Sequence, residues 1–266
     1  MLPSFKLARP RTLTEALDAI GDDKVPYCGG TELLLAMRAG LHRPETLVDI
    51  KGVVELSGVS VDNGTVVLGA AERHMDLATH PLVRRHLPML AAVEGAVGNA
   101  RVRAQGSIGG NLCFAEPKSD VATALVAYGA QVTLASPDKL RTVPVEEFVV
   151  GPYFADKEPD ELLVDIRIPV PASGTEAAYV KYQITERPTV GVALLHDRSN
   201  VTCRLVVGAV GEVQTLWTFT EPADIEPEAI ADELDPTPDL TGSERYKRHV
   251  AAVFVRRAIN VLGAAA

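Results

Sequence analysis

Residues 105–111 read QGSIGGN, and a second pair of adjacent glycines occurs in residues 27–32, which read YCGGTE. In both segments the glycines stand beside small polar residues at an expected strand end or turn. Adjacent glycines allow backbone angles that other residues avoid, and they have no Cβ atom to block a ligand. Consecutive N–H groups in such a turn can converge on an anion. We therefore expect the two segments to face each other and to bind the two phosphates of a diphosphate group.

The surroundings of the two segments narrow the kind of anion site. A helix is expected over residues 33–39, and the positive end of its dipole would favour the same anion. Neither segment has the glycine spacing of a Rossmann fold or a P-loop. Neither contains a lysine, so backbone N–H groups would do most of the binding. Arg101 and Arg103 could add positive potential to the anion site or simply lie on the surface. For each glycine segment taken alone, a turn with a purely structural role stays the alternative.

Hydrophobic patterning along the rest of the chain predicts an α+β protein. Expected helices cover residues 13–20, 76–86, 88–94 and 121–128, and expected strands cover residues 25–28, 46–50, 65–70 and 131–135. Apolar runs at residues 162–168, 177–183, 190–196 and 201–210 predict an antiparallel meander. Residues 205–244 contain no Lys or Arg, ten Asp or Glu and four prolines, which predicts mostly loop with one short helix near residues 229–234. A last amphipathic helix is expected over residues 244–262.

Composition argues against several classes of protein. None of the 266 residues belongs to an apolar run long enough for a transmembrane helix, and residues 1–10 lack the apolar centre of a secretory signal. The three cysteines, Cys28, Cys113 and Cys203, form no C-x-x-C pair, so no disulfide framework, zinc site or iron–sulfur cluster is expected. The net charge of −9 argues against a nucleic-acid binder. We expect a cytoplasmic protein that neither inserts into a membrane nor binds nucleic acid.

Four segments together resemble one known family. They are YCGGTELLLAMRAG (27–40), GAAERHMDL (69–77), VGNARVRAQGSIGGNLCFAEPKSDVATALVAYGAQVTL (97–134) and GSERYKRHVAAVFVRRAI (242–259). In order and spacing they are similar to the FAD-binding medium subunit of molybdenum hydroxylases, a family that includes xanthine dehydrogenase and CO dehydrogenase. The most specific part is SIGGNL (107–112) followed by PKSD (117–120).

The resemblance implies a fold and a division into domains. An FAD-binding module of the PCMH type would comprise two subdomains, residues 1–51 and 52–164. An α+β domain with an antiparallel sheet would follow at residues 165–266. Molybdopterin and [2Fe–2S] clusters would be bound only by partner subunits, and FAD by this chain.

The resemblance also implies which residues bind FAD. The first glycine segment would wrap the diphosphate with Cys28, Gly29, Gly30, Thr31, Glu32 and Leu33. The second would hold its other side with Ser107, Ile108, Gly109, Gly110 and Asn111. Ala70, after Gly69, matches a strand end near the cofactor. Asp120 resembles an aspartate that bonds the ribose or ribityl hydroxyls, and it could also cap the next helix, because a carboxylate has several acceptor sites.

Two departures from the family pattern bear on these expectations. The family's Arg-x-x-Asp-x-Ala segment beside the flavin ring aligns with residues 186–191, which lack the aspartate, so Thr189 and Val190 become candidates for covering the ring. Thr31-Glu32 and Asn111 stand where CO-dehydrogenase-type chains commonly have His-Ser and Asp. These differences favour the xanthine-dehydrogenase side of the family.

The resemblance implies electron transfer as the function, with no catalytic side chain in this chain. A large molybdopterin subunit would oxidise the substrate, a small subunit with two [2Fe–2S] clusters would relay electrons to FAD, and FAD would pass them to NAD, a quinone or another acceptor. The complex would be a dimer of heterotrimers. Two other classes stay open, namely a non-redox assembly scaffold of the same fold and a stand-alone flavin-dependent oxidoreductase.

Overall fold

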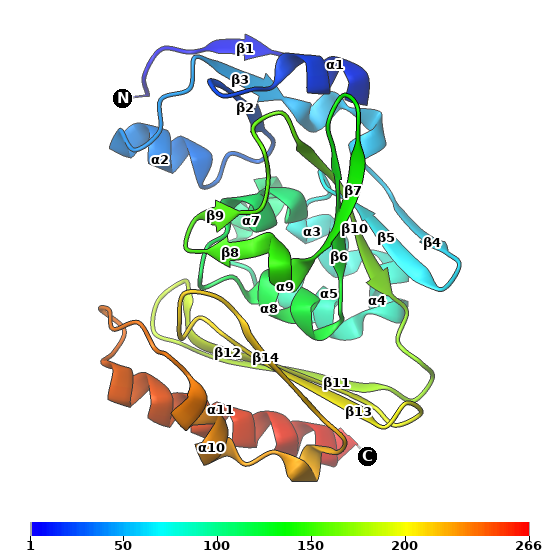
Figure 1. Ribbon diagram of the computed structural model, residues 1–266, viewed down its shortest axis with the longest axis vertical. Coiled ribbons are helices and arrows are strands. Elements are labelled where there is room, and N and C mark those ends of the chain that lie inside the picture. Colours follow the sequence, from blue (N-terminus) through cyan, green and yellow to red (C-terminus); the bar gives the residue numbers. More distant parts are fainter. Residues whose placement is uncertain (1, 266) are drawn as a thin grey trace.

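The structure is a computed structural model that describes residues 2–265 and stacks three units along its longest axis (Figure 1). An N-terminal, a middle and a C-terminal unit each have their own sheet and their own cluster of buried apolar residues. Helices pack against all three sheets, and the sheet of the C-terminal unit is antiparallel throughout. The expected α+β class is confirmed.

The N-terminal unit contains a small parallel sheet in the order β1-β3-β2. Its elements are β1 (Lys6–Ala8), α1 (Leu13–Ala19), β2 (Lys24–Tyr27), α2 (Leu33–Ala39) and β3 (Thr46–Asp49). Helix α1 begins where the Thr12 hydroxyl accepts a hydrogen bond from the Glu15 N–H at 3.2 Å, which satisfies an orphan amide. Helix α2 ends at Gly40, whose φ of 77° costs glycine no steric strain. The 3₁₀ turns η1 (Ile50–Gly52) and η2 (Val54–Leu56) lead into the middle unit.

The middle unit is built on a five-stranded sheet in the order β4-β5-β10-β6-β7. Its strands are β4 (Val59–Asp62), β5 (Thr65–Gly69), β6 (Gln131–Ala135), β7 (Leu140–Pro144) and β10 (Leu162–Pro169), with β8 (Val149–Gly151) and β9 (Phe154–Ala155) as a separate pair. Its helices are α3 (His74–Thr79), α4 (Pro81–His86), α5 (Pro88–Gly95), α6 (Ala100–Gln105), α7 (Ile108–Phe114), α8 (Asp120–Ala127) and α9 (Val145–Phe148). Leu90, Leu125 and Val132 are fully buried in its core, which holds helices and sheet together.

Strand β10 departs from the expected organisation. The run at residues 162–168 was expected to begin the C-terminal meander, with a domain boundary after Val164. In the structure β10 lies at the centre of the middle sheet, where Asp165 pairs with both Gly69 and Thr133. A boundary at residue 164 would cut this strand, and the connection to the C-terminal unit runs instead through residues 170–175.

The C-terminal unit is an antiparallel sheet between two helical layers. Its elements are β11 (Glu176–Gln183), β12 (Pro188–Asp197), β13 (Thr202–Gly208), β14 (Thr215–Phe219), η3 (Pro222–Asp224), α10 (Pro227–Glu233) and α11 (Glu244–Ala265). Successive side chains of a strand point to opposite faces, so Val192 packs in the core shared with α11 and Ala193 in the core of the middle unit. This two-sided burial explains the continuous apolar run of β12. Strand β14 falls in the acidic stretch that was expected to be mostly loop.

Candidate functional site

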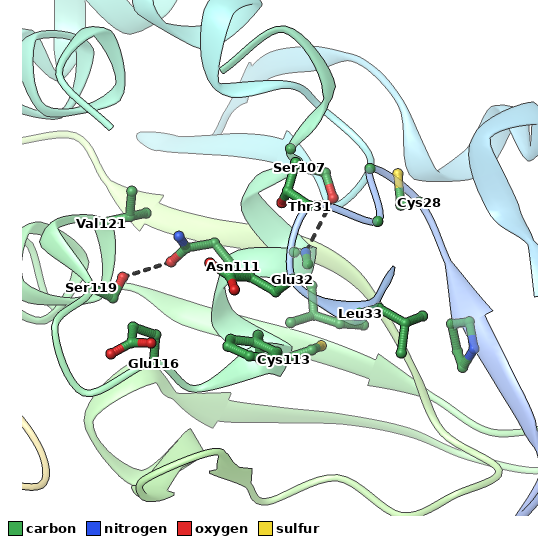
Figure 2. Close-up of a pocket in the computed structure, with 18 of the residues that line it drawn as sticks. Cys28, Thr31, Glu32, Leu33, Ser107, Asn111, Cys113, Glu116, Ser119 and Val121 are labelled. Atoms are coloured by element: carbon green, nitrogen blue, oxygen red, sulfur yellow. Dashed lines mark hydrogen bonds between the residues drawn. The ribbon is translucent and has the colours of Figure 1, made fainter. Parts of the chain in front are cut away.

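A cavity of about 560 Å³ lies where the first two units meet the turn between β11 and β12. Most of its wall is formed by residues from the β2–α2 connection, the α6–α8 region, the segment before β10 and the β11–β12 turn. Figure 2 labels residues of the first two of these regions. The volume falls within the range of small-molecule and cofactor sites. Both glycine segments contribute to this wall.

The first glycine segment touches the second directly. A Cβ atom on Gly29 would lie 2.1 Å from the carbonyl oxygen of Gln105 and 2.7 Å from the Cα atom of Gly106. Gly30 adopts a φ of +68°, and a Cβ there would lie 2.4 Å from the Tyr27 ring. Only glycine fits at either position, and the expectation that the two segments face each other is confirmed.

The backbone of the first segment leaves consecutive donors open. Among residues 2–265, no acceptor receives a hydrogen bond from the N–H groups of Gly30, Thr31 and Glu32. Glu32 precedes α2 without capping it through its side chain. Three successive amides without a protein partner form the kind of concave donor set that binds anions. The residues of this segment therefore fit a phosphate group.

The second glycine segment does not supply such donors, which corrects the expectation from sequence. Gly109 and Gly110 lie in the first turn of α7 and not in a loop. The Gly109 N–H donates to the Ala70 carbonyl at 2.9 Å, and the Gly110 N–H donates to the Ser107 hydroxyl at 3.2 Å. The role of Gly109 is steric, because a Cβ there would lie 2.7 Å from the Cβ and carbonyl oxygen of Ala70.

The segment after α7 connects the cavity to the C-terminal unit. The Ser119 hydroxyl donates to the Asn111 side-chain oxygen at 2.6 Å (Figure 2) and accepts from the Ala122 N–H at 3.1 Å. Ser119 is therefore the N-cap of α8, a position expected for Asp120. The Asp120 carboxylate instead accepts from the Tyr179 hydroxyl at 2.5 Å and from Lys181 Nζ at 2.7 Å, both on β11. Burial and the Asp120 charge raise the pKa of Tyr179 well above its ordinary value.

Replacing Asp120 with alanine is expected to lower the free energy of unfolding by about 1–3 kcal/mol. The change leaves the Tyr179 hydroxyl and the Lys181 ammonium group without their carboxylate. The Lys181 side chain is 17 % exposed, and this exposure to water reduces the cost. Urea unfolding of Asp120→Ala, Lys181→Met and the double variant gives the measurement. If the two single effects add up in the double variant, the two side chains do not interact.

An arginine bridges two carboxylates at the rim of the cavity. Arg187, in the β11–β12 turn, donates from Nη2 to Glu32 Oε1 at 2.8 Å and from Nη1 to the Glu116 carboxylate. Glu116 also accepts from the Tyr153 hydroxyl at 3.2 Å. One side chain of the C-terminal unit thereby joins both other units.

The two residues expected to cover a flavin ring lie elsewhere. Thr189 and Val190 are fully buried in β12 and are not part of the cavity wall. Val190 packs in the core with α11 because of the strand alternation described above. The side chains that reach the cavity from this segment are Glu186, Arg187 and Pro188.

The charge of the cavity wall was not foreseen from the sequence. Acidic side chains outnumber basic ones, with Asp22, Glu32, Glu116, Asp120 and Glu186 against Lys118, Lys157 and Arg187. Arg101 and Arg103 are not part of the wall, and Arg103 instead donates to the carbonyls of Val97 and Gly98 at 2.9 and 3.1 Å. Anion binding here must therefore depend mainly on backbone N–H groups.

Most of the predicted residues meet at this cavity. Its wall includes Cys28, Gly29, Gly30, Thr31, Glu32, Leu33, Ala70, Ser107, Gly109, Gly110, Asn111 and Asp120. Ile108 and Val190 do not belong to it, because each is fully buried in a hydrophobic core. Sequence reasoning missed His74, although it lies in the quoted segment 69–77, and Glu116 beside the PKSD segment.

Comparison with known proteins gives concordant results. Residues 3–171 match the family described as the FAD binding domain in molybdopterin dehydrogenase. The carbon monoxide dehydrogenase medium chain of Hydrogenophaga pseudoflava is 31% identical over 97% of this chain and 96% of its own length. A putative xanthine dehydrogenase FAD-binding subunit of Escherichia coli K12 is 26% identical over 97% and 96%. The solved carbon monoxide dehydrogenase of H. pseudoflava superposes with a TM-score of 0.91 at 31% identity, covering 99% of each chain.

The identities do not support the branch of the family that the sequence favoured. The substitutions at Thr31-Glu32 and Asn111 favoured the xanthine-dehydrogenase side, but identity is higher to the carbon monoxide dehydrogenase chain than to the xanthine dehydrogenase subunit. Across residues 2–265, none of the helices combines the length and the apolar character needed to cross a bilayer.

Proposed function

We propose an electron-transfer role for this chain, which belongs to the family of FAD-binding domains in molybdopterin dehydrogenases. In this proposal it is the FAD-carrying subunit of a molybdenum hydroxylase complex. FAD, when bound, supplies the redox chemistry by accepting and releasing electrons, and the protein supplies binding, orientation and electrostatics. The role is supported best by the three consecutive backbone N–H groups of Gly30, Thr31 and Glu32 that have no acceptor among the described residues. They lie beside the contact between Gly29 and the second glycine segment.

The residues of the cavity suggest how FAD would be held. The open amides of the first segment would receive the diphosphate, with Gly29 allowing its approach to the second segment. Ala70, Ser107, Gly109 and Gly110 would form the opposite wall, and Asn111 and Asp120 would offer oxygen acceptors to hydroxyl groups. The contacts of Asp120 with β11 leave further acceptor sites on its carboxylate.

The names of the relatives indicate a multi-subunit setting. We infer that a small subunit with [2Fe–2S] clusters delivers electrons to FAD in this chain, that a large molybdopterin subunit oxidises the substrate, and that NAD, a quinone or another acceptor receives the electrons. The three cysteines of this chain are too few for a cluster of the usual four-cysteine kind. We further propose a dimer of heterotrimers in the cytoplasm.

Arg187 should contribute to FAD affinity by neutralising Glu32 and Glu116 at the rim. In Arg187→Met the two carboxylates would repel the diphosphate, and we expect FAD to bind about two- to fivefold more weakly, a modest effect because the arginine is 42 % exposed. Fluorescence titration of the FAD-free chain measures this. Arg198→Met, which removes an exposed pair with Glu176, is the control and should leave the affinity unchanged.

The complex with its partner subunits tests the function directly. Addition of the complex's substrate should bleach the flavin absorbance and lead to reduction of the acceptor. Removing FAD should stop reduction of the physiological acceptor but leave intact the oxidation of substrate with an artificial electron acceptor. Adding FAD back should restore reduction of the physiological acceptor. Acceptor reduction that continues without FAD would favour the scaffold alternative. Bleaching by substrate in this chain alone would favour a stand-alone oxidoreductase.

A further inference from the structure

A buried histidine–glutamate pair lies at the cavity wall, outside both glycine segments. His74 begins α3 and Glu94 lies in α5, and their side chains are 3 % and 0 % exposed. His74 Nδ1 is 2.5 Å from Glu94 Oε2. The other carboxylate oxygen, Oε1, has no hydrogen-bond partner among residues 2–265. The function assigned above does not use this pair.

The burial of the pair determines which ring nitrogen carries a proton. An isolated buried charge is costly, so the pair should be neutral in sum. Glu94 can be protonated and donate to Nδ1 of a neutral ring, or it can be ionised beside an imidazolium. The third neutral arrangement, with Nδ1–H facing a protonated Glu94, would place the carboxyl proton on Oε1, which is buried and has no partner among residues 2–265, so it is disfavoured. In the first two states Nε2 of His74 carries a hydrogen. Nε2 has no acceptor among the described residues and, unlike Glu94 Oε1, it is not sealed from the surface, so an acceptor can reach it from outside the protein.

The position of the ring shows where that acceptor must come from. Because Nδ1 is turned to Glu94, the opposite edge of the ring faces Gly106, where a Cβ would lie 3.0 Å from Cδ2 and 3.3 Å from Nε2 of His74. Gly106 and His74 both belong to the cavity wall, and Gly106 is the residue against which Gly29 packs. No hydrogen bond joins Nε2 to any residue of the described chain. The remaining side is the cavity, at the junction of the two glycine segments.

We propose that His74 is a further FAD-binding residue, whose Nε2–H donates a hydrogen bond to the diphosphate of FAD while Glu94 positions the ring. The inference rests on the proposed placement of FAD. It gives the fully buried Glu94 a role, which is to hold the ring with Nδ1 turned away from the cavity. It also supplies a donor on the side of the second glycine segment, where the amides of Gly109 and Gly110 are already occupied.

Two substitutions of His74 separate the donor from the contact with Glu94. In His74→Gln the amide nitrogen can reach the place of Nε2, whereas in His74→Asn it reaches only the place of Nδ1 and keeps the contact with Glu94. We expect His74→Asn to bind FAD at least about tenfold more weakly and His74→Gln to stay within about threefold of the unaltered chain. Fluorescence titration of FAD-free full-length chain provides the affinities, and thermal unfolding verifies that both variants fold.

A spectroscopic readout excludes a merely structural role. The ³¹P resonances of bound FAD should shift in His74→Asn but not in Val102→Ala, which alters another part of the cavity wall without removing a donor. In the unaltered chain labelled with ¹⁵N-histidine, the Nε2 resonance of His74 should shift on addition of FAD but not of riboflavin, which has no phosphate. This measurement needs no variant to fold.

Equal affinities of the asparagine and glutamine variants, or ³¹P and Nε2 resonances that do not respond, would overturn the assignment of His74. An Nε2 resonance that responds equally to riboflavin would also overturn it, because the acceptor would then lie on the flavin ring. The unaltered chain is titrated in parallel. If it bound no FAD, both this inference and the proposed function would fail, whereas normal binding with unresponsive His74 contradicts this inference alone.

Discussion

A Gly110→Asp chain is expected to fold normally and to purify without FAD. Gly110 lies at the cavity wall, and the only atom close to a Cβ there is the Ser107 hydroxyl oxygen at 2.9 Å, so a new side chain would extend toward the place proposed for the diphosphate. A carboxylate beside phosphates costs several kcal/mol, which corresponds to a loss of affinity of about 100-fold or more. An acidic residue in the first turn of a helix is favourable, so α7 should persist.

The matched control is Gly110→Asn, which has nearly the same shape without the charge. It should retain more FAD than the aspartate variant, as measured by the ratio of flavin absorbance to protein absorbance after gel filtration. Circular dichroism shows whether α7 and its surroundings stay folded. Stoichiometric FAD in Gly110→Asp would show that the diphosphate lies away from this helix.

Gly29→Ala is expected to reduce both folding stability and FAD binding. The added Cβ would lie 2.1 Å from the Gln105 carbonyl oxygen, a backbone atom that cannot turn away. The two glycine segments would have to separate, at a cost of about 3 kcal/mol, or roughly 6–12 °C in unfolding temperature for a chain of this size. Separation would also widen the space between the open amides and α7, so FAD retention should fall.

Gly21→Ala serves as the control for this substitution. Gly21 lies in the same unit and also at the cavity wall, but no heavy atom lies within 4 Å of its Cβ position. Its unfolding temperature and FAD content should stay close to those of the unaltered chain. If Gly29→Ala behaved in the same way, the contact between the glycine segments would not be needed for the site.

Local signals in the sequence were sufficient for many elements. Helix α2 runs over residues 33–39 as expected, because apolar spacing and the C-terminal glycine at Gly40 are encoded within a few residues. The meeting of the two glycine segments was also foreseen, since both lack side chains where a second backbone must approach. The helix depends on residues that are neighbours in the sequence, and the contact between the glycine segments depends on the residue type alone.

Other features depend on contacts between distant residues and could not be read in this way. Two adjacent glycines disfavour a helix, yet α7 passes through Gly109 and Gly110 because Gly109 must pack against Ala70. The partners of Asp120 lie about sixty residues away on β11. His74 gave no local signal as a site residue, because its significance comes from Glu94 and from the position of Gly106.

The central place of β10 has a consequence for how the chain is made. During synthesis, β5 is made long before residues 162–169 and β6 shortly before them, and until β10 has emerged the middle sheet lacks the strand that both of them pair with. Pairing across such a sequence separation is slow, because a long loop must close before the contacts form. The unpaired edges of β5 and β6 are meanwhile exposed to aggregation. The nascent middle unit should therefore depend on chaperones until β10 has emerged.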